Sequence, residues 1–143
     1  MIFLEKEEDK ISLYGLRLPR EYLRNTYDEN GKIGLSIEEL KKRFGEVEDG
    51  FTMQLAHNPL YFNVYAEYGV DLTFSGHVHG GVVRLPLLGG LLSPDRTFFP
   101  KYSKGLYKEE DKMIVVSPGI GGIKLRVFNR PTMYVVKLVR NES

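Results

Sequence analysis

Short runs of alternating apolar and polar residues recur along the chain and predict β-strands, because the two sides of a strand face different surroundings. This pattern predicts strands at residues 11–16, 51–55, 70–74 and 123–128, and short apolar runs predict further strands at 2–4, 82–85, 113–116 and 133–139. The charged residues 5–10 join the first two strands and predict a hairpin, and the Asn30-Gly31 pair predicts a turn.

A different spacing predicts two helices. Ser36 and Glu39 have the spacing of a capping box at the start of a helix over 36–44. The apolar residues of this helix fall on one face, namely Ile37, Leu40 and Phe44. A second helix is expected at about 60–68, with Asn58 as its N-cap and Pro59 at its first position.

The second helix lies between two predicted strands, 51–55 and 70–74, so the three form a strand-helix-strand unit. If the strands pair in parallel, their C-terminal ends lie along one edge of the sheet, where sites of open α/β folds form. The later strands are expected to pair antiparallel. We therefore predict an α/β fold with a mixed sheet, in one domain that covers residues 1–143.

The apolar stretch 85–96 contains prolines and adjacent glycines that exclude a regular helix. We expect it to be a loop that covers core residues. The alternative is an apolar surface beside the site, or an apolar edge there that contacts a membrane. Arg84 and Arg96 beside it are possible phosphate contacts. Residues 97–107 are expected to be a packed connector.

Composition narrows the function. The 20 basic and 19 acidic residues nearly cancel, so no nucleic-acid footprint is expected. The absence of cysteine excludes disulfides and thiolate zinc sites. The acidic start does not resemble a leader peptide, and no apolar run approaches the roughly 18 residues that span a bilayer, so we expect a cytoplasmic location.

The candidate chemistry lies in three histidines. His77 and His79 are separated by one residue within a glycine-rich stretch, and His57 follows the strand 51–55. Neutral imidazole is a common metal ligand. In an extended strand the rings of His77 and His79 would point to opposite sides, so they need a turn to share one ion, or each binds a different one of two ions. The alternative is that the histidines, His57 above all, are structural.

The stretches Ala56-His57-Asn58-Pro59 and Gly76-His77-Val78-His79-Gly80-Gly81 resemble the calcineurin-like metallophosphoesterases, in particular a bacterial subgroup of phosphohydrolases and phosphodiesterases. The resemblance covers the C-terminal half of that family's four-layer α/β/β/α sandwich. It implies that His57 and His77 bind one divalent metal and His79 a second, with manganese, iron or zinc as candidates. The two metals would activate a water for attack on a phosphoester.

The family's other metal motifs, Asp-x-His, Gly-Asp-x-x-Asp and Gly-Asn-His, are absent from this sequence. We therefore expect the chain to be the C-terminal part of such a domain, with no catalytic residue of its own and weak or no activity alone. Without the bridging carboxylate it is expected to hold one metal or none. Apolar surface left uncovered predicts self-association or a missing N-terminal half.

Two alternatives remain at this point. The chain could be a non-catalytic remnant that binds a metal or oligomerises, or a β-rich interaction domain whose histidines are structural. The substrate cannot be named from the residues.

Overall fold

The computed structural model describes residues 2–6, 9–20, 22, 34–85, 89–92, 98–121 and 126–139. All structural statements below concern these residues. The predicted turn at Asn30-Gly31 and the candidate phosphate contact Arg96 lie outside them.

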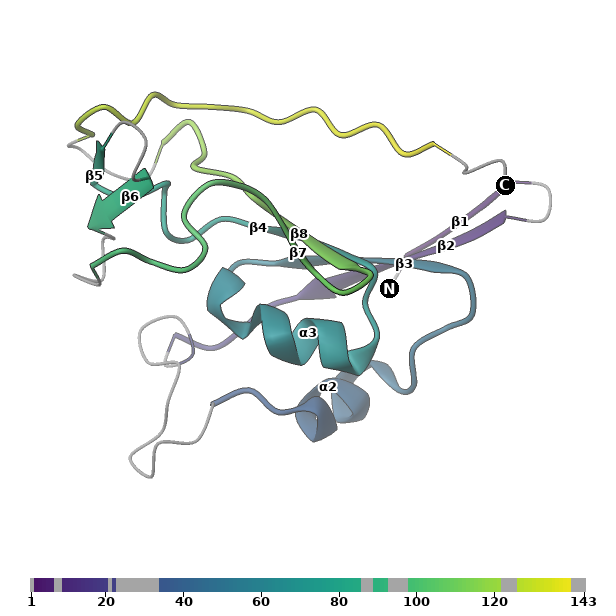
Figure 1. Ribbon diagram of the computed structural model, residues 1–143. Helices are drawn as coiled ribbons and strands as arrows, with labels where there is room; N and C mark the ends of the chain where they lie inside the picture. Colours follow the sequence, from purple (N-terminus) through teal and green to yellow (C-terminus); the bar gives the residue numbers. More distant parts are fainter. Residues whose placement is uncertain are drawn as a thin grey trace.

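A six-stranded mixed sheet forms the centre of the fold, with strand order β1-β2-β3-β4-β8-β7 (Figure 1). Its strands are β1 (Ile2–Lys6), β2 (Asp9–Leu16), β3 (Phe51–Ala56), β4 (Leu72–Ser75), β7 (Gly105–Glu109) and β8 (Lys112–Val116). A separate two-stranded sheet contains β5 (Val83–Leu85) and β6 (Gly89–Leu92).

The four central strands, β2, β3, β4 and β8, pair in parallel, and an antiparallel hairpin closes each side. The predicted hairpin between β1 and β2 and the predicted parallel pairing of β3 with β4 are both confirmed. The expectation of antiparallel pairing after this unit holds for β5 with β6 and β7 with β8, but β8 pairs in parallel with β4.

Both predicted helices form. In α2 (Ile37–Phe44), Ser36 Oγ accepts a hydrogen bond from the Glu39 amide, as the capping pattern predicted. The second helix begins as a 3-10 turn (Pro59–Tyr61), capped by Asn58, and continues as α3 (Phe62–Tyr68). Gly69 ends it in the left-handed conformation, with φ of 114°. No helix among the described residues is long and apolar enough to cross a membrane.

Both helices lie on one side of the main sheet (Figure 1). The buried core between them and the sheet includes apolar side chains from β2, β3 and α3, for example Leu16, Ala56 and Tyr65. The same side of the sheet also buries several polar side chains, which are Ser12, Thr52, Gln54, Thr73 and Ser75.

The opposite side of the sheet, which we call the open face, carries apolar side chains at paired positions of neighbouring strands. Those that are half-buried or exposed are Ile11, Leu13, Phe51, Met53, Leu55, Phe74, Leu106 and Met113. Leu55, for example, is 49% exposed. The neighbouring Leu72 and Val115 on this face are buried.

The C-terminal segment, residues 133–139, was predicted to be a strand and is not one. It runs extended on the side of the sheet away from the helices (Figure 1), but none of its residues belongs to a β-ladder. Side-chain exposure still alternates along it: Val135 is 89% exposed and Val136 is 42% exposed. The apolar alternation is that of a strand, but within the described residues no neighbouring strand pairs with it.

Two other sequence predictions need correction. The connector predicted at 97–107 ends earlier, because Gly105 begins β7. Of the strand predicted at 123–128, only residues 126–128 are described, and Val127 forms a single isolated bridge to Val83. β7 forms because it pairs with the adjacent strand β8 as a hairpin. Residues 123–125 of the other segment lie outside the described residues.

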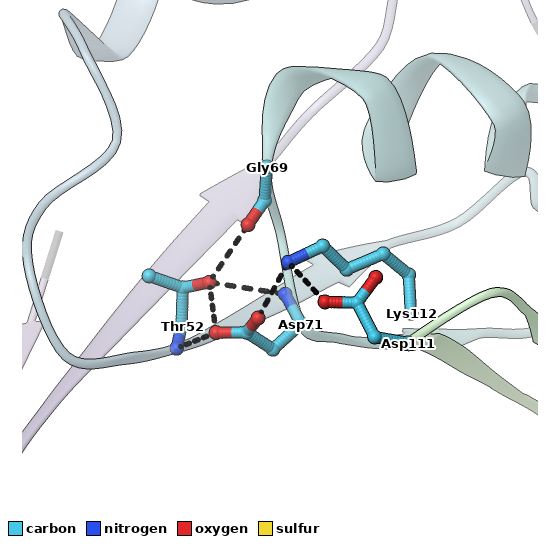
Figure 2. A network of polar contacts seen from close by, with 5 residues as sticks. All are labelled: Thr52, Gly69, Asp71, Asp111 and Lys112. Carbon is cyan, nitrogen blue, oxygen red and sulfur yellow. Dashed lines mark hydrogen bonds and ion pairs between the residues drawn. The ribbon is translucent and has the colours of Figure 1, made fainter.

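A polar network joins three of the central strands at the end of the sheet opposite the histidines (Figure 2). The Asp71 carboxylate accepts hydrogen bonds from the Thr52 amide and hydroxyl, both at 2.8 Å, and from Lys112 Nζ at 2.7 Å. Thr52 is the second residue of β3, Asp71 precedes β4 and Lys112 is the first residue of β8, so the network holds these strands in register.

Burial alone would raise the pKa of Asp71, but the hydrogen bonds from Lys112 and Thr52 outweigh it and lower that pKa. The network therefore stabilises the fold above the usual carboxyl pKa of about 3.9, and this stabilisation is lost as the pH falls through the lowered pKa. Asp71→Asn should lower the free energy of unfolding at neutral pH by about 1–3 kcal/mol. As the pH falls, the free energy of unfolding of this variant should decrease less than that of the unaltered chain. Urea unfolding across the acidic range measures both.

Asp111→Asn is the matched control, because Asp111 contacts the same Lys112 Nζ at 3.4 Å but its side chain is 75% exposed. It should change the free energy of unfolding by less than about 0.5 kcal/mol. Equal effects of the two substitutions would show that the buried network does not set this stability.

Candidate metal centre

The three histidines follow two parallel strands at the same edge of the sheet. His57 comes directly after β3, and His77 and His79 lie in the loop after β4. The backbone joins the two loops, because the Gly76 amide donates a hydrogen bond to the His57 carbonyl at 3.2 Å. Ser75 Oγ donates to the carbonyl of Ala56 and ties the strand ends together.

The rings of His57 and His77 contact each other edge to face. Their centroids are 5.1 Å apart and their planes are inclined by 73°. His79 lies close enough to act on the same ring: burial lowers the pKa of His57 most, and the neighbouring His77 and His79 lower it further. A lowered pKa favours the neutral imidazole, which is the form that can bind a metal.

The loop that carries His77 and His79 adopts a backbone conformation that is unusual for such residues. Both histidines have positive φ, of 61° and 50°, which side chains with a Cβ adopt only at a cost. The sequence suggested that the glycines would make the turn needed between the two rings. The histidines themselves take up left-handed angles as well, so the loop is not an extended strand here.

Packing and hydrogen bonds hold this loop in place. Val78, between the two histidines, is 1% exposed and packs in the core beside Phe62 and Ile114. The buried side chain of Asn129 donates from Nδ2 to the carbonyls of His79 at 2.7 Å and Gly81 at 2.6 Å. The sequence gives no local signal for this role of Asn129, because its partners lie about 50 positions earlier.

Asn58 fixes the other loop. It is fully buried, its Oδ1 accepts a hydrogen bond from the Leu60 amide, and its Nδ2 donates to the carbonyl of Tyr22 at 2.8 Å. Its own carbonyl accepts from the Tyr65 hydroxyl. The residue after His57 is therefore immobilised, while His57 itself is exposed at the sheet edge.

The geometry of the His57–His77 pair is compatible with a shared metal ion. Two imidazoles bound to one ion by metal–nitrogen bonds of about 2.1 Å at a tetrahedral angle have ring centroids about 5 Å apart. The observed 5.1 Å is close to this separation, and it is also the usual spacing of two rings packed edge to face. Among the described residues, however, no group of three or more His, Cys, Asp or Glu side chains is arranged to hold a metal ion. The pair therefore fits part of a ligand set.

Comparisons with known proteins support the family resemblance. Over 90 residues the chain is 32% identical to the uncharacterized metallophosphoesterase YkuE of Bacillus subtilis, covering 62% of this chain and 31% of that protein. It is 35% identical over 86 residues to the phosphodiesterase YaeI of Escherichia coli, covering 59% and 31%. It is 30% identical over 96 residues to the UDP-2,3-diacylglucosamine pyrophosphatase LpxG of Chlamydia muridarum, covering 58% and 27%.

Over about three-fifths of its length the chain is thus similar to proteins named metallophosphoesterase or phosphodiesterase. It spans about a third of the length of the curated relatives that it matches. No family model matches the sequence, and no solved structure matches it.

Gly80 offers a test of how closely the histidine loop is packed. Its φ is 75°, and a Cβ at this position would lie 2.8 Å from Asn129 Oδ1 and 2.9 Å from Pro118 Cβ. Gly80→Ala should therefore lower the free energy of unfolding by about 2–4 kcal/mol, from backbone strain and the two close contacts. Urea unfolding measures the loss, and the NMR signals of the His57 and His77 rings should shift.

The control is Gly119→Ala, because Gly119 has a similar φ of 66° but no atom lies within 4 Å of the added Cβ. Only the backbone cost of about 1–2 kcal/mol is expected there. If both variants lose the same free energy, the contacts with Asn129 and Pro118 do not hold the loop.

Proposed function

We propose that this chain forms part of a metal-dependent phosphoester hydrolase, in which His57, His77 and His79 are metal ligands. The observation that supports this most strongly is the His57–His77 pair, with ring centroids 5.1 Å apart at the C-terminal edge of parallel strands. The printed names of the relatives agree with it, since they include metallophosphoesterases, a phosphodiesterase and a pyrophosphatase.

In this proposal the chain supplies the nitrogen ligands and their fixed placement. His57 and His77 would hold one ion, and His79 would face a second. Divalent manganese, iron or zinc fits such nitrogen donors, and the bound metals would activate a water and neutralise the phosphoryl oxygens. The lowered pKa of His57 keeps this ring neutral and ready to bind at neutral pH.

Three imidazoles carry no charge and cannot offset the repulsion between two divalent ions. Carboxylate ligands would be needed for a dinuclear site, and no acidic side chain joins the histidines in the described part of the chain. We propose that a further polypeptide segment supplies them, as the missing N-terminal half expected from the family resemblance. Alone, the chain would be weakly active or inactive.

Two surfaces support the proposal of an additional segment. The open face presents paired apolar side chains opposite the helix-covered side, and the extended residues 133–139 leave their backbone groups outside any ladder. Exposed apolar surface and unpaired strand edges both favour association with another chain or segment.

The relatives narrow the proposed substrate to a compound with a phosphoester or pyrophosphate linkage, because one is named a phosphodiesterase and another a pyrophosphatase. A second candidate function is a non-catalytic module that binds one metal ion or oligomerises. The incomplete ligand set among the described residues favours this alternative over catalysis by the chain alone.

Metal binding by the purified chain tests the ligand assignment. The chain should bind about one equivalent of Mn²⁺ or Zn²⁺, and His57→Ala or His77→Ala should each weaken binding about tenfold or more, because a ligand is lost. Isothermal titration calorimetry measures the affinity. Asn63→Ala, which changes an exposed residue of α3, should leave it unaltered.

Turnover of a generic aryl phosphodiester in the presence of these metals should be weak or absent. A robust metal-dependent turnover that His77→Ala abolishes would contradict the need for a further segment, while confirming the ligand. Unchanged metal affinity in both histidine variants would overturn the assignment itself.

Association of the chain tests the role of the exposed apolar surfaces. Light scattering should give a mass above that of a monomer, and Val135→Lys should raise the monomer fraction, because a lysine in this extended, unpaired segment opposes pairing with a strand of another chain. Ile120→Lys is the control: Ile120 is 79% exposed, close to the 89% of Val135, but lies outside both surfaces. A monodisperse monomer of the unaltered chain would contradict this prediction.

A further inference from the structure

Two arginines flank a backbone bridge that follows the histidine loop. Val83 of β5 forms an isolated parallel bridge with Val127, and the Arg84 amide donates to the Val127 carbonyl, so Arg84 and Arg126 come from neighbouring segments. Lys104, which precedes β7, contributes a third positive charge near them. Burial lowers the pKa of Lys104 most, and the positive charges of Arg84 and Arg126 lower it further. All three are only partly exposed, so water screens their mutual repulsion incompletely.

The hydrogen bonds that these three side chains form do not use all of their donor groups. Lys104 Nζ donates to the Thr132 hydroxyl at 2.9 Å. Arg126 Nη2 donates to the carbonyls of Pro118 and Gly121. By contrast, Nη1 of Arg84 and Nη1 of Arg126 are both buried and have no hydrogen-bond acceptor within the described residues. Buried charged donors without an acceptor are strongly unfavourable, so such groups in a native protein require an explanation.

No carboxylate of the described residues forms an ion pair with any of these three cations. Other basic residues of the chain do have such partners; Lys112, for example, pairs with Asp71. Three neighbouring cations with unused donors and no acid beside them are a favourable environment for an oxyanion, and guanidinium groups match the geometry of phosphate oxygens.

The cluster and the histidine loop are joined through shared neighbours. Arg126 contacts the carbonyl of Pro118, whose ring would touch a Cβ on Gly80 of the histidine loop. The backbone of Arg84 bonds to the carbonyl of Val127, two residues before Asn129, which holds His79 and Gly81. Anything bound by the cations would therefore lie beside the proposed metal centre.

We propose that Arg84, Lys104 and Arg126 form a binding site for a phosphate group of the substrate, next to the histidine loop. This inference rests on the proposed phosphoester hydrolase function, but the binding itself requires no metal. In this arrangement Nη1 of both arginines and the remaining protons of Lys104 Nζ donate to the phosphate oxygens, and the negative charge relieves the repulsion among the cations.

Binding measured without metal separates this site from the metal centre. In buffer containing EDTA, inorganic phosphate and bis(p-nitrophenyl) phosphate are titrated into the chain and followed by calorimetry and ³¹P NMR. Saturable binding is expected, and Arg84→Gln or Arg126→Gln should each weaken it about tenfold or more, as expected for loss of a hydrogen bond between charged groups. His77→Ala should not change this affinity, although it removes a proposed metal ligand.

Arg130→Gln is the matched control for the arginine variants, because Arg130 is exposed and lies outside the cluster. For Lys104→Gln the control is Lys108→Gln, an exposed position on β7. Both controls should bind phosphate like the unaltered chain. Preference for the diester would assign the site to the substrate, and equal binding of inorganic phosphate would assign it to the product as well; both results support the site.

Thermal unfolding distinguishes a binding site from a purely structural cluster. Without phosphate, Arg84→Gln should unfold at the same temperature as the unaltered chain or higher, because one repelling charge is gone. With phosphate, the unaltered chain and the two control variants should gain in unfolding temperature, and Arg84→Gln should gain less at the same phosphate concentration. The proposal is overturned if the unaltered chain shows no saturable binding in the millimolar range, or if the cluster variants bind as well as their controls.

Discussion

The parallel register of β3, β4 and β8 is the constraint on which the rest of the structure depends. In that register Met53 lies beside Leu72, and Leu72 beside Met113. The Asp71 carboxylate bonds to Thr52 and Lys112 at one end of these strands and thereby resists a slip between them. At the other end the same register brings the two histidine-bearing loops together. A shift by one residue would turn each side chain to the opposite face of the sheet.

The two faces of the main sheet differ in the side chains that they carry. The side under the helices buries Thr52, Gln54 and Thr73, whereas the uncovered side carries Phe51, Met53 and Leu55. The helix-covered side also carries buried apolar side chains, such as Leu16 and Ile114, so both sides of the sheet are apolar in part. The arrangement is understandable if both sides are covered in the working protein, because a sheet between two layers needs apolar residues on each. The open face and the proposal of a further segment therefore have one physical origin.

The histidine loop has a strained backbone, and contacts with the rest of the protein hold it in place. The left-handed angles of His77 and His79 are unfavourable, and the loop keeps them because buried Val78 anchors its middle and Asn129 binds its carbonyls. Strained backbone that surrounding contacts enforce is typical of functional sites. The same segment that carries Asn129 also carries Arg126, so one stretch of chain supports the histidine loop and supplies a cation to the proposed phosphate site.

The sequence by itself determined the local elements and the candidate chemistry. Alternation identified β2 and β3, an apolar run identified β8, and the Ser36 and Asn58 caps marked the helix starts. The motifs around His57, His77 and His79 indicated the candidate site and the family resemblance. These features depend on neighbours in the chain and can be read from its order.

The tertiary structure alone decided the rest. Residues 133–139 have the pattern of a strand but pair with no strand among the described residues. Asn129 holds the histidine loop, and Lys104 and Arg126 have their proposed role, only through residues distant in the sequence, because pairing and electrostatic interactions depend on proximity in space.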